Sequence, residues 1–227
     1  MDSATRIMTQ IFQCKIFMIE IYSKIEKTSM SDMPKVTFDG IIEEIDTIEK
    51  AEEAIEKLSK EKIVGFDTET KPSFVKGVNH KVALLQFSTE RTAYLFRLNI
   101  IGIPKCIADF LSDSKIIKVG IAVRDDFNSL GSRSRVTPAG FVDLTDLSGE
   151  IGIEEKGLQK IYAILFGRKI SKSQQLSNWE AESLTEGQRQ YAAIDAWACL
   201  KIYTYLSKLK KNGKYRIVRN DAEESNT

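Results

Sequence analysis

The spacing of apolar residues along the chain predicts a series of helices and strands. Over residues 46–60, four apolar side chains share one face of a helix: Ile48, Ala51, Ile55 and Leu58. The same spacing predicts further helices near 104–112 and 123–131, one starting near Gly157, and a long one from about Thr185 to Leu209. Short apolar runs predict strands at 63–67, 82–88, 92–96, 115–120 and 141–144.

The order of these elements predicts the fold class. Three strands in succession, followed by alternating helix and strand, are typical of a mixed sheet with helices on its faces. We therefore expect an α/β fold, with a single domain over residues 36–210 built on a mixed five-stranded sheet flanked by helices. Residues 1–35 are predicted to be an N-terminal extension, residues 211–227 a polar tail, and residues 70–81 a loop between the first two strands.

Composition and charge exclude some classes of protein. Hydrophobic residues make up 42% of the chain and charged residues 29%, which is ordinary for a globular domain. The 33 basic residues against 32 acidic ones exclude an overall basic surface, although a local basic groove is compatible with them. Three distant cysteines without metal-ligand spacing predict free thiols in a reducing compartment.

The N-terminal region contains an apolar run over residues 11–25. Lys15, Glu20 and Lys24 interrupt it, so it has neither the length of a membrane-spanning helix nor the uninterrupted core of a signal peptide. We therefore expect a cytoplasmic chain without a membrane partner. Its oligomeric state cannot be predicted from these features.

A pair of carboxylates follows the first predicted strand, in the motif GFDTET at residues 65–70. Strand side chains alternate, so Val64 and Phe66 face one side and Asp67 and Glu69 face the other. Two carboxylates on one face form half of a site for Mg²⁺, which prefers oxygen ligands. A polar strand end that faces water would have the same pattern.

A second acidic motif occurs in the helix predicted at 123–131. If Val123, Phe127 and Leu130 form its buried face, Asp126 lies beside that face. Successive residues are about 100° apart, so Asp125 lies a further 100° away from the buried face than Asp126 and is nearly opposite to that face. Asp126 is therefore the better candidate for a cleft, and Asp125 for solvent or for the start of the helix.

The last predicted helix carries a third motif. Tyr191 and Asp195 are four residues apart and therefore neighbours on one face. Several small residues around them would let the helix approach a sheet or a ligand closely: Ala192, Ala193, Ala196 and Ala198. Thr185 and Gln188 have the spacing of a capping box at the start of this helix. Taken alone, the motif is more typical of a core tyrosine beside an incidental aspartate than of a functional pair.

Together, the three motifs resemble those of the DEDD exonuclease superfamily. Asp67 and Glu69 match its first motif, and Asp126 matches the second. Tyr191 and Asp195 match the third motif in the tyrosine branch, which includes RNase D and the exonuclease domain of Werner helicases. The similarity to that domain extends over residues 36–208 and includes VALLQFS, FVDLTDL, SNW and YAAIDAWA.

The resemblance implies an RNase H-like fold and a metal-dependent 3'–5' exonuclease that releases nucleoside 5'-monophosphates from single-stranded or recessed 3' ends of DNA or RNA. It implies two Mg²⁺ ions per site, with Mn²⁺ as a substitute, and four ligands: Asp67, Glu69, Asp126 and Asp195. In the family's arrangement Asp67 would bridge both ions, and Tyr191 would orient the attacking water.

Substrate contacts are predicted at three further residues. The backbone around Thr68 lies between two metal ligands and would touch the terminal nucleotide. Lys172 would hold a phosphate. Trp179 would either stack on a base or pack as an anchor in the SNW turn. We assign Leu85, Phe87 and Trp197 to the core.

Two questions stay open at the level of sequence. A degenerate exonuclease fold kept as a nucleic-acid-binding module is the main alternative to an enzyme, although such modules usually lose a metal ligand. Within the enzyme interpretation, DNA and RNA are equally open as substrates, because no base-reading element is visible.

Overall fold

The computed structural model describes residues 18–219. Residues 1–17 of the predicted extension, with the start of the apolar run, and residues 220–227 of the predicted tail lie outside this part. The strands are β1 (Ile19–Tyr22), β2 (Ile41–Ile45), β3 (Ile63–Thr70), β4 (Val82–Ser88), β5 (Thr92–Arg97), β6 (Ile117–Gly120), β7 (Phe141–Asp143) and β8 (Tyr215–Val218). The helices are α2 (Ile48–Leu58), α3 (Leu98–Ile101), α4 (Lys105–Ser112), α5 (Val123–Gly131), α6 (Leu144–Ile151), α7 (Leu158–Phe166) and α8 (Glu186–Asn212).

The main sheet is mixed and has the strand order β2-β5-β4-β3-β6-β7. β4 pairs antiparallel with β3 and β5, while the pairs β2–β5, β3–β6 and β6–β7 are parallel. The predicted α/β class with a mixed sheet is confirmed. The predicted number of five strands is wrong, because β2 adds a sixth strand at one edge.

The missed strand β2 has a physical explanation. Glu43 and Glu44 follow each other in the middle of IIEEI, so the strand lacks a clean alternation of apolar and polar residues. Glu44 is accommodated because it forms an ion pair with Arg97, whose side chain is buried in β5. The helices α3 and α6 were also not predicted; each is short and begins directly where a strand ends.

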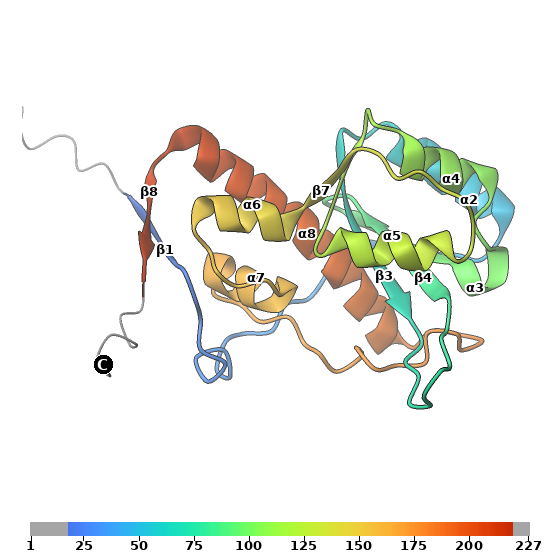
Figure 1. Cartoon of the computed structure of the whole chain (residues 1–227), viewed down its shortest axis with the longest axis horizontal. Coiled ribbons are helices and arrows are strands. Elements are labelled where there is room, and N and C mark those ends of the chain that lie inside the picture. Colours follow the sequence, from blue (N-terminus) through green and yellow to red (C-terminus); the bar gives the residue numbers. More distant parts are fainter. Residues whose placement is uncertain (1–17, 220–227) are drawn as a thin grey trace, which may run out of the picture.

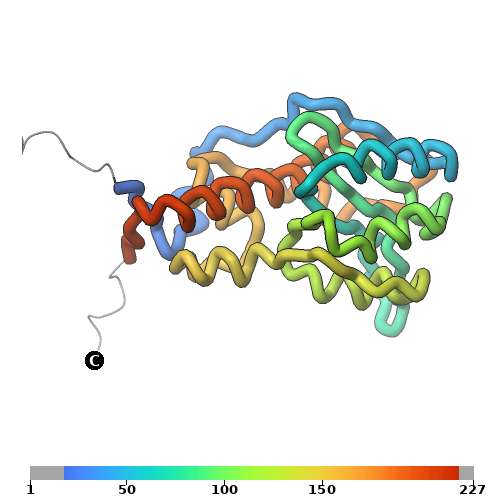
Figure 2. Tube along the Cα trace, turned by 90° about the horizontal axis from the view of Figure 1, so that it is seen from above, coloured from blue at the N-terminus to red at the C-terminus, as the bar shows by residue number. Residues whose placement is uncertain are grey.

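Helices cover both faces of the main sheet (Figures 1 and 2). On one face, α2, α4 and α5 enclose an aromatic-rich core that includes Phe66, Phe87 and Phe96. On the other face, α6, α7 and α8 pack over a second core that includes Val119 and Ile161. The predicted core residues Leu85 and Phe87 are fully buried, and Trp197 is partly buried against the second core.

The close approach of α8 to β3 depends on a glycine. A Cβ atom added at Gly65 would lie 1.8 Å from the carbonyl oxygen of Ala196 in α8, so only glycine fits there. On the helix side, Ala192, Ala193 and Ala196 are all fully buried, as expected of small residues in a close helix–sheet contact. The capping box of Thr185 and Gln188 that the sequence predicts is also present.

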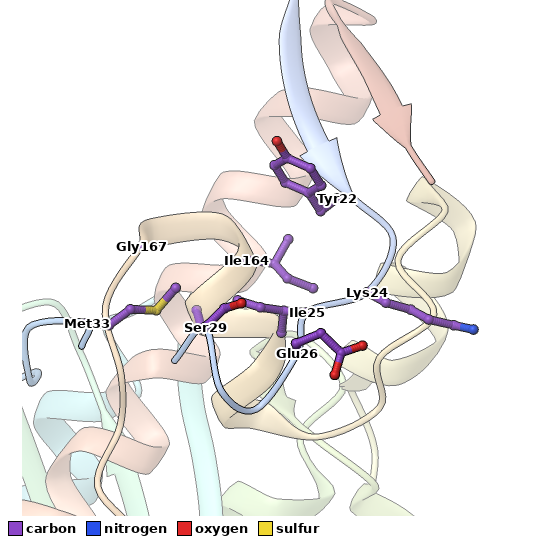
Figure 3. Close-up of a pocket in the computed structure, with 9 residues that line it drawn as sticks. Tyr22, Lys24, Ile25, Glu26, Ser29, Met33, Ile164 and Gly167 are labelled. Atoms are coloured by element: carbon purple, nitrogen blue, oxygen red, sulfur yellow. The ribbon is translucent and has the colours of Figure 1, made fainter. Parts of the chain in front are cut away.

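The residues flanking the predicted domain pair with each other. β1 and β8 form a parallel two-stranded sheet, which lies at the far end of α8 in both views (Figures 1 and 2). Below it, a pocket of about 350 Å³ lies between the segment 22–33 and α7, with Tyr22, Ile25, Met33 and Ile164 on its walls (Figure 3). Among residues 18–219, no helix is long and apolar enough to cross a membrane.

Candidate metal centre and active site

The acidic cluster forms where α8 crosses the end of β3. Gly65, Asp67 and Glu69 alternate onto one face of β3, and α8 packs directly on this face at Gly65. Asp195 directly precedes Ala196, the residue of α8 that contacts Gly65, and is therefore brought to Asp67. One ligand oxygen from each of the carboxylates Asp67, Glu69 and Asp195 lies within 4.8 Å of the others. The structure thus brings together three of the four predicted ligands.

The fourth predicted ligand, Asp126, lies beside this cluster and makes a separate contact. It belongs to the first turn of α5, and its carboxylate accepts a hydrogen bond from the hydroxyl of Thr68 in β3. Its charge contributes to the raised pKa of both Asp67 and Glu69. Asp126 is half-buried and Asp125 is exposed, as helical phase predicts for these two side chains.

Burial raises the pKa of each of these four carboxyl groups, and for Asp67 and Glu69 repulsion from the neighbouring carboxylates raises it further. Burial, followed by repulsion from Asp195, Glu69 and Asp126, raises the pKa of Asp67 well above its usual range. Burial, followed by repulsion from Asp195 and Asp126, raises the pKa of Glu69 to about 9. Burial raises the pKa of Asp195 to about 7 and that of Asp126 to about 6. Carboxylates held in this way are in a costly state that a cation would relieve.

Tyr191 lies one helical turn before Asp195 and faces the same cluster. Its side chain is 7% exposed, and a hydrogen bond with Asp195 opposes part of the rise in the pKa of that carboxyl group. Burial and the nearby charges of Asp195, Glu69 and Asp67 raise the pKa of Tyr191 above its ordinary value. The phenol therefore keeps its proton at neutral pH and acts as a hydrogen-bond donor.

The cluster fits a hard divalent cation. Oδ1 of Asp195 is buried and has no hydrogen-bond partner among the described residues, so it is an oxygen in need of a ligand. Carboxylate oxygens are the donors that Mg²⁺ and Mn²⁺ prefer. Within residues 18–219, this is the group of acidic side chains whose oxygens converge closely enough to hold an ion.

Asp143, for which the sequence favours a surface or capping role over metal binding, stabilises the starts of α5 and α6. Its carboxylate accepts hydrogen bonds from the backbone N–H groups of Ala122 and Val123, at the start of the helix that carries Asp126. It also caps α6 through the N–H of Thr145. Ala122 has a φ of 52°, an unfavourable conformation for a residue with a Cβ atom, and the Asp143 contacts hold it there. In the sequence, Asp143 is part of the motif FVDLTDL, which is among the segments that resemble the exonuclease family.

The three predicted substrate residues have different environments. Thr68 lies between the two ligands of β3, with its hydroxyl engaged by Asp126. Lys172 is exposed on the segment that precedes α8. Trp179 is fully buried, and its ring centroid lies 6.0 Å from that of Tyr191. The stacking interpretation of Trp179 is therefore wrong for this structure, because the indole has no open face; it packs behind Tyr191 instead.

The raised pKa values predict an unusual pH dependence of stability without metal. Carboxyl groups whose pKa is higher in the folded than in the unfolded state contribute stability that is present near pH 4 and lost as pH rises. Because the pKa of Asp195 is about 7 and that of Glu69 about 9, this stability is lost progressively from about pH 4 to pH 9. The shift of Asp195 alone corresponds to about 4 kcal/mol, or a fall in Tm of roughly 10 °C.

This dependence can be measured by thermal denaturation in EDTA between pH 5 and pH 9. Saturating Mg²⁺ or Mn²⁺ should raise the Tm more at pH 8 than at pH 5.5, because the ion binds the charged carboxylates. The variant Asp195→Asn should flatten the profile, whereas Asp125→Asn, on the exposed side of α5, should not. A Tm in EDTA that is constant or increases over this range would contradict the electrostatic description of the cluster.

Comparison with known proteins agrees with this site. A family model described as 3'-5' exonuclease matches residues 42–211. The mouse bifunctional 3'-5' exonuclease/ATP-dependent helicase WRN is 31% identical over 212 residues, which cover 88% of this chain and 15% of that protein. A 3'-5' exonuclease of Arabidopsis thaliana is 36% identical over 153 residues, 64% of this chain and 53% of that protein. The match thus spans about half or less of these relatives.

Solved structures show the same fold. The EXO domain of Aedes aegypti Nibbler has a TM-score of 0.71 at 21% identity, covering 79% of this chain and 94% of that domain. Escherichia coli RNase D has a TM-score of 0.68 at 22% identity, covering 75% of this chain and 45% of RNase D. The RNase H-like fold expected from the motifs is therefore confirmed. Because the family model matches most of its length, the chain belongs to the 3'–5' exonuclease family.

Proposed function

We propose that this protein is a metal-dependent 3'–5' exonuclease that hydrolyses phosphodiester bonds at the 3' ends of DNA or RNA and releases nucleoside 5'-monophosphates. The observation that carries the proposal is the convergence of Asp67, Glu69 and Asp195 within 4.8 Å at the crossing of β3 and α8. Membership in a metal-dependent family supports it independently.

We assign Mg²⁺ as the physiological cation, two ions per site, with Mn²⁺ as a functional substitute. Asp67, Glu69 and Asp195 would hold them, with Asp126 as the fourth ligand after its carboxylate leaves the hydroxyl of Thr68. When bound, such ions supply Lewis-acid stabilisation of the phosphoryl oxygens and lower the pKa of water. Four carboxylates without such counter-charge would repel both each other and a phosphodiester.

The protein's own groups position the reactants. Tyr191 would donate a hydrogen bond to the attacking water and orient it, because its raised pKa makes it a poor base. The backbone at Thr68, between Asp67 and Glu69, would contact the terminal nucleotide. Lys172 is exposed and free to reach a backbone phosphate. None of these contacts reads a base, so the proposed specificity is for a 3' end and not for a sequence.

The proposed substrate class is a single-stranded or recessed 3' end. A solved relative, the RNase D of Trypanosoma brucei, is described in complex with the RNA U12. This RNA-bound protein shares the fold of this chain, and the mouse relative WRN combines a 3'-5' exonuclease with an ATP-dependent helicase. We therefore propose that the site accepts a single strand of either polymer.

Digestion of oligonucleotides labelled at the 5' end tests the function. With Mg²⁺ or Mn²⁺, the full chain should shorten a single-stranded 20-mer in single-nucleotide steps, and the released products should be nucleoside 5'-monophosphates. EDTA should abolish the reaction. Parallel digestion of single-stranded RNA, single-stranded DNA and a recessed duplex defines the preferred polymer. Internal cleavage, or nucleoside 3'-monophosphates as products, would contradict the proposal.

A further inference from the structure

The loop between β3 and β4 exposes apolar side chains next to the acidic cluster. Phe74 is 84% exposed, Val75 67% and Val78 44%. Apolar side chains stabilise a fold only where they are buried, so exposed apolar side chains that cluster in one place often mark an interaction site. The loop leaves β3 after Thr70, the residue that follows Glu69, and projects beyond the sheet (Figure 1). Packing within the fold does not explain an aromatic side chain at Phe74, because this side chain is mostly exposed.

The tip of this loop has a defined backbone. The N–H of Val78 donates to the carbonyl oxygen of Val75 at 3.2 Å, which closes a four-residue turn. Gly77 occupies its third position with a φ of +84°, the conformation that a type II turn requires and that glycine allows. The Ser73 hydroxyl donates to the carbonyl of Val75 at 3.1 Å. Phe74 therefore directly precedes an ordered turn, between two residues whose groups are hydrogen-bonded to each other.

Both ends of the loop are held by one residue, Glu180. At the start of the loop, Nζ of Lys71 lies 3.6 Å from Oε2 of Glu180. His80, near its end, lies with Nδ1 3.5 Å from Oε1 of the same carboxylate. Glu180 follows Trp179, which packs against Tyr191, so the loop is anchored to the same core that supports the active-site tyrosine.

A pocket of about 620 Å³ lies between this loop and α5. Its wall begins at Thr70, next to Glu69, and includes Asn128 and Ser129 of α5, the helix that carries Asp126. Ser73 and Val75, on either side of Phe74, also line it. Residues 71–81 contain three lysines and no acidic residue, so the loop is electrostatically suited to a phosphate backbone.

We propose that Phe74 is a stacking platform for an unpaired base on the 5' side of the cleaved bond, in a single strand that runs from the acidic cluster past the tip of this loop. The inference rests on the proposed nuclease function and deepens it. Every base has an aromatic face, so the contact is independent of sequence. A paired base is already stacked in a duplex, so the contact favours 3' ends with several unpaired nucleotides.

The variant Phe74→Ala tests this role. On a single-stranded dodecathymidylate, its KM should rise about tenfold with kcat nearly unchanged, since one base–aromatic stack has about that effect. Hydrolysis of the p-nitrophenyl ester of thymidine 5'-monophosphate, which contains the cleaved bond but no upstream base, should not change. Phe74→Trp should retain the wild-type KM. Ile100→Ala, which removes a side chain on α3 that is 53% exposed, is the matched control.

Oligonucleotides with a single abasic residue locate the contact. For the wild type, an abasic residue at one of the first few positions from the 3' end should raise KM, and in Phe74→Ala the same residue should have no further effect. Equal KM values for wild type and Phe74→Ala on the dodecathymidylate would overturn the proposal and indicate another partner for the tip. If the wild type cleaves neither substrate, the nuclease function fails. Fluorescence anisotropy of the labelled strand then tests Phe74 by itself, with weaker binding by Phe74→Ala as the supporting result.

Discussion

Replacing Asp67 with asparagine is expected to lower the rate of 3'-terminal hydrolysis by about 10³-fold or more, because the loss of several kcal/mol of charge stabilisation has this effect. Asp67 lies at the centre of the cluster: its pKa responds to Asp195, Glu69 and Asp126 together. Asparagine keeps the shape of the side chain, so the fold should persist. It removes the negative charge on which the binding of a cation depends.

The stability of the same variant should change in the opposite direction. In EDTA at pH 8, Asp67→Asn should have a higher Tm than the wild type, because the pKa of Asp67 is raised in the folded state, which costs stability at this pH, and asparagine does not titrate. Mg²⁺ should then raise its Tm much less than that of the wild type. A merely structural aspartate would show neither effect.

Two measurements on purified protein complete the test: kcat on a single-stranded oligonucleotide with Mg²⁺, and the Tm with and without the ion. Asp195→Asn should behave like Asp67→Asn, because Oδ1 of Asp195 is the buried oxygen without a partner among the described residues. Asp125→Asn is the matched control, since Asp125 is exposed beside Asp126. Near-normal nuclease activity of folded Asp67→Asn would refute the site.

Replacing Gly65 with alanine is expected to destabilise the protein by about 3 kcal/mol, with a fall in Tm of roughly 10 °C. The new Cβ atom would lie 1.8 Å from the carbonyl oxygen of Ala196, and this neighbour is backbone, which cannot rotate away. Either α8 must move off β3 or β3 must bend. Both changes displace Asp195 relative to Asp67, so protein that still folds should also lose most of its activity.

Thermal denaturation of Gly65→Ala together with Gly149→Ala separates the contact from a general effect of glycine replacement. Gly149 lies in α6, and a Cβ atom there would meet no atom within 4 Å. Alanine is favoured over glycine in a helix, so Gly149→Ala should leave the Tm unchanged or raise it slightly. Equal Tm values for Gly65→Ala and wild type would show that α8 does not pack on β3 as described.

Local patterns in the sequence predicted the parts of this protein that depend on local physics. Side-chain alternation placed Asp67 and Glu69 on one face of a strand, and helical phase separated Asp126 from Asp125. The capping box at Thr185 was also predictable, since it depends on residues three positions apart. The similarity of the motifs to a known family then supplied the fold and the function, which no single motif could.

The tertiary structure decided what depends on residues far apart in the chain. Trp179 is buried because Tyr191 packs against it, and nothing in the SNW motif distinguishes this from an exposed ring. β2 is a strand because it pairs with β5, where Arg97 also forms an ion pair with Glu44. The carboxylates of β3 and α8 meet because a glycine in β3 lets α8 approach to backbone contact. Sequence patterns determine which face of an element a side chain occupies, and only packing determines which other element that face meets.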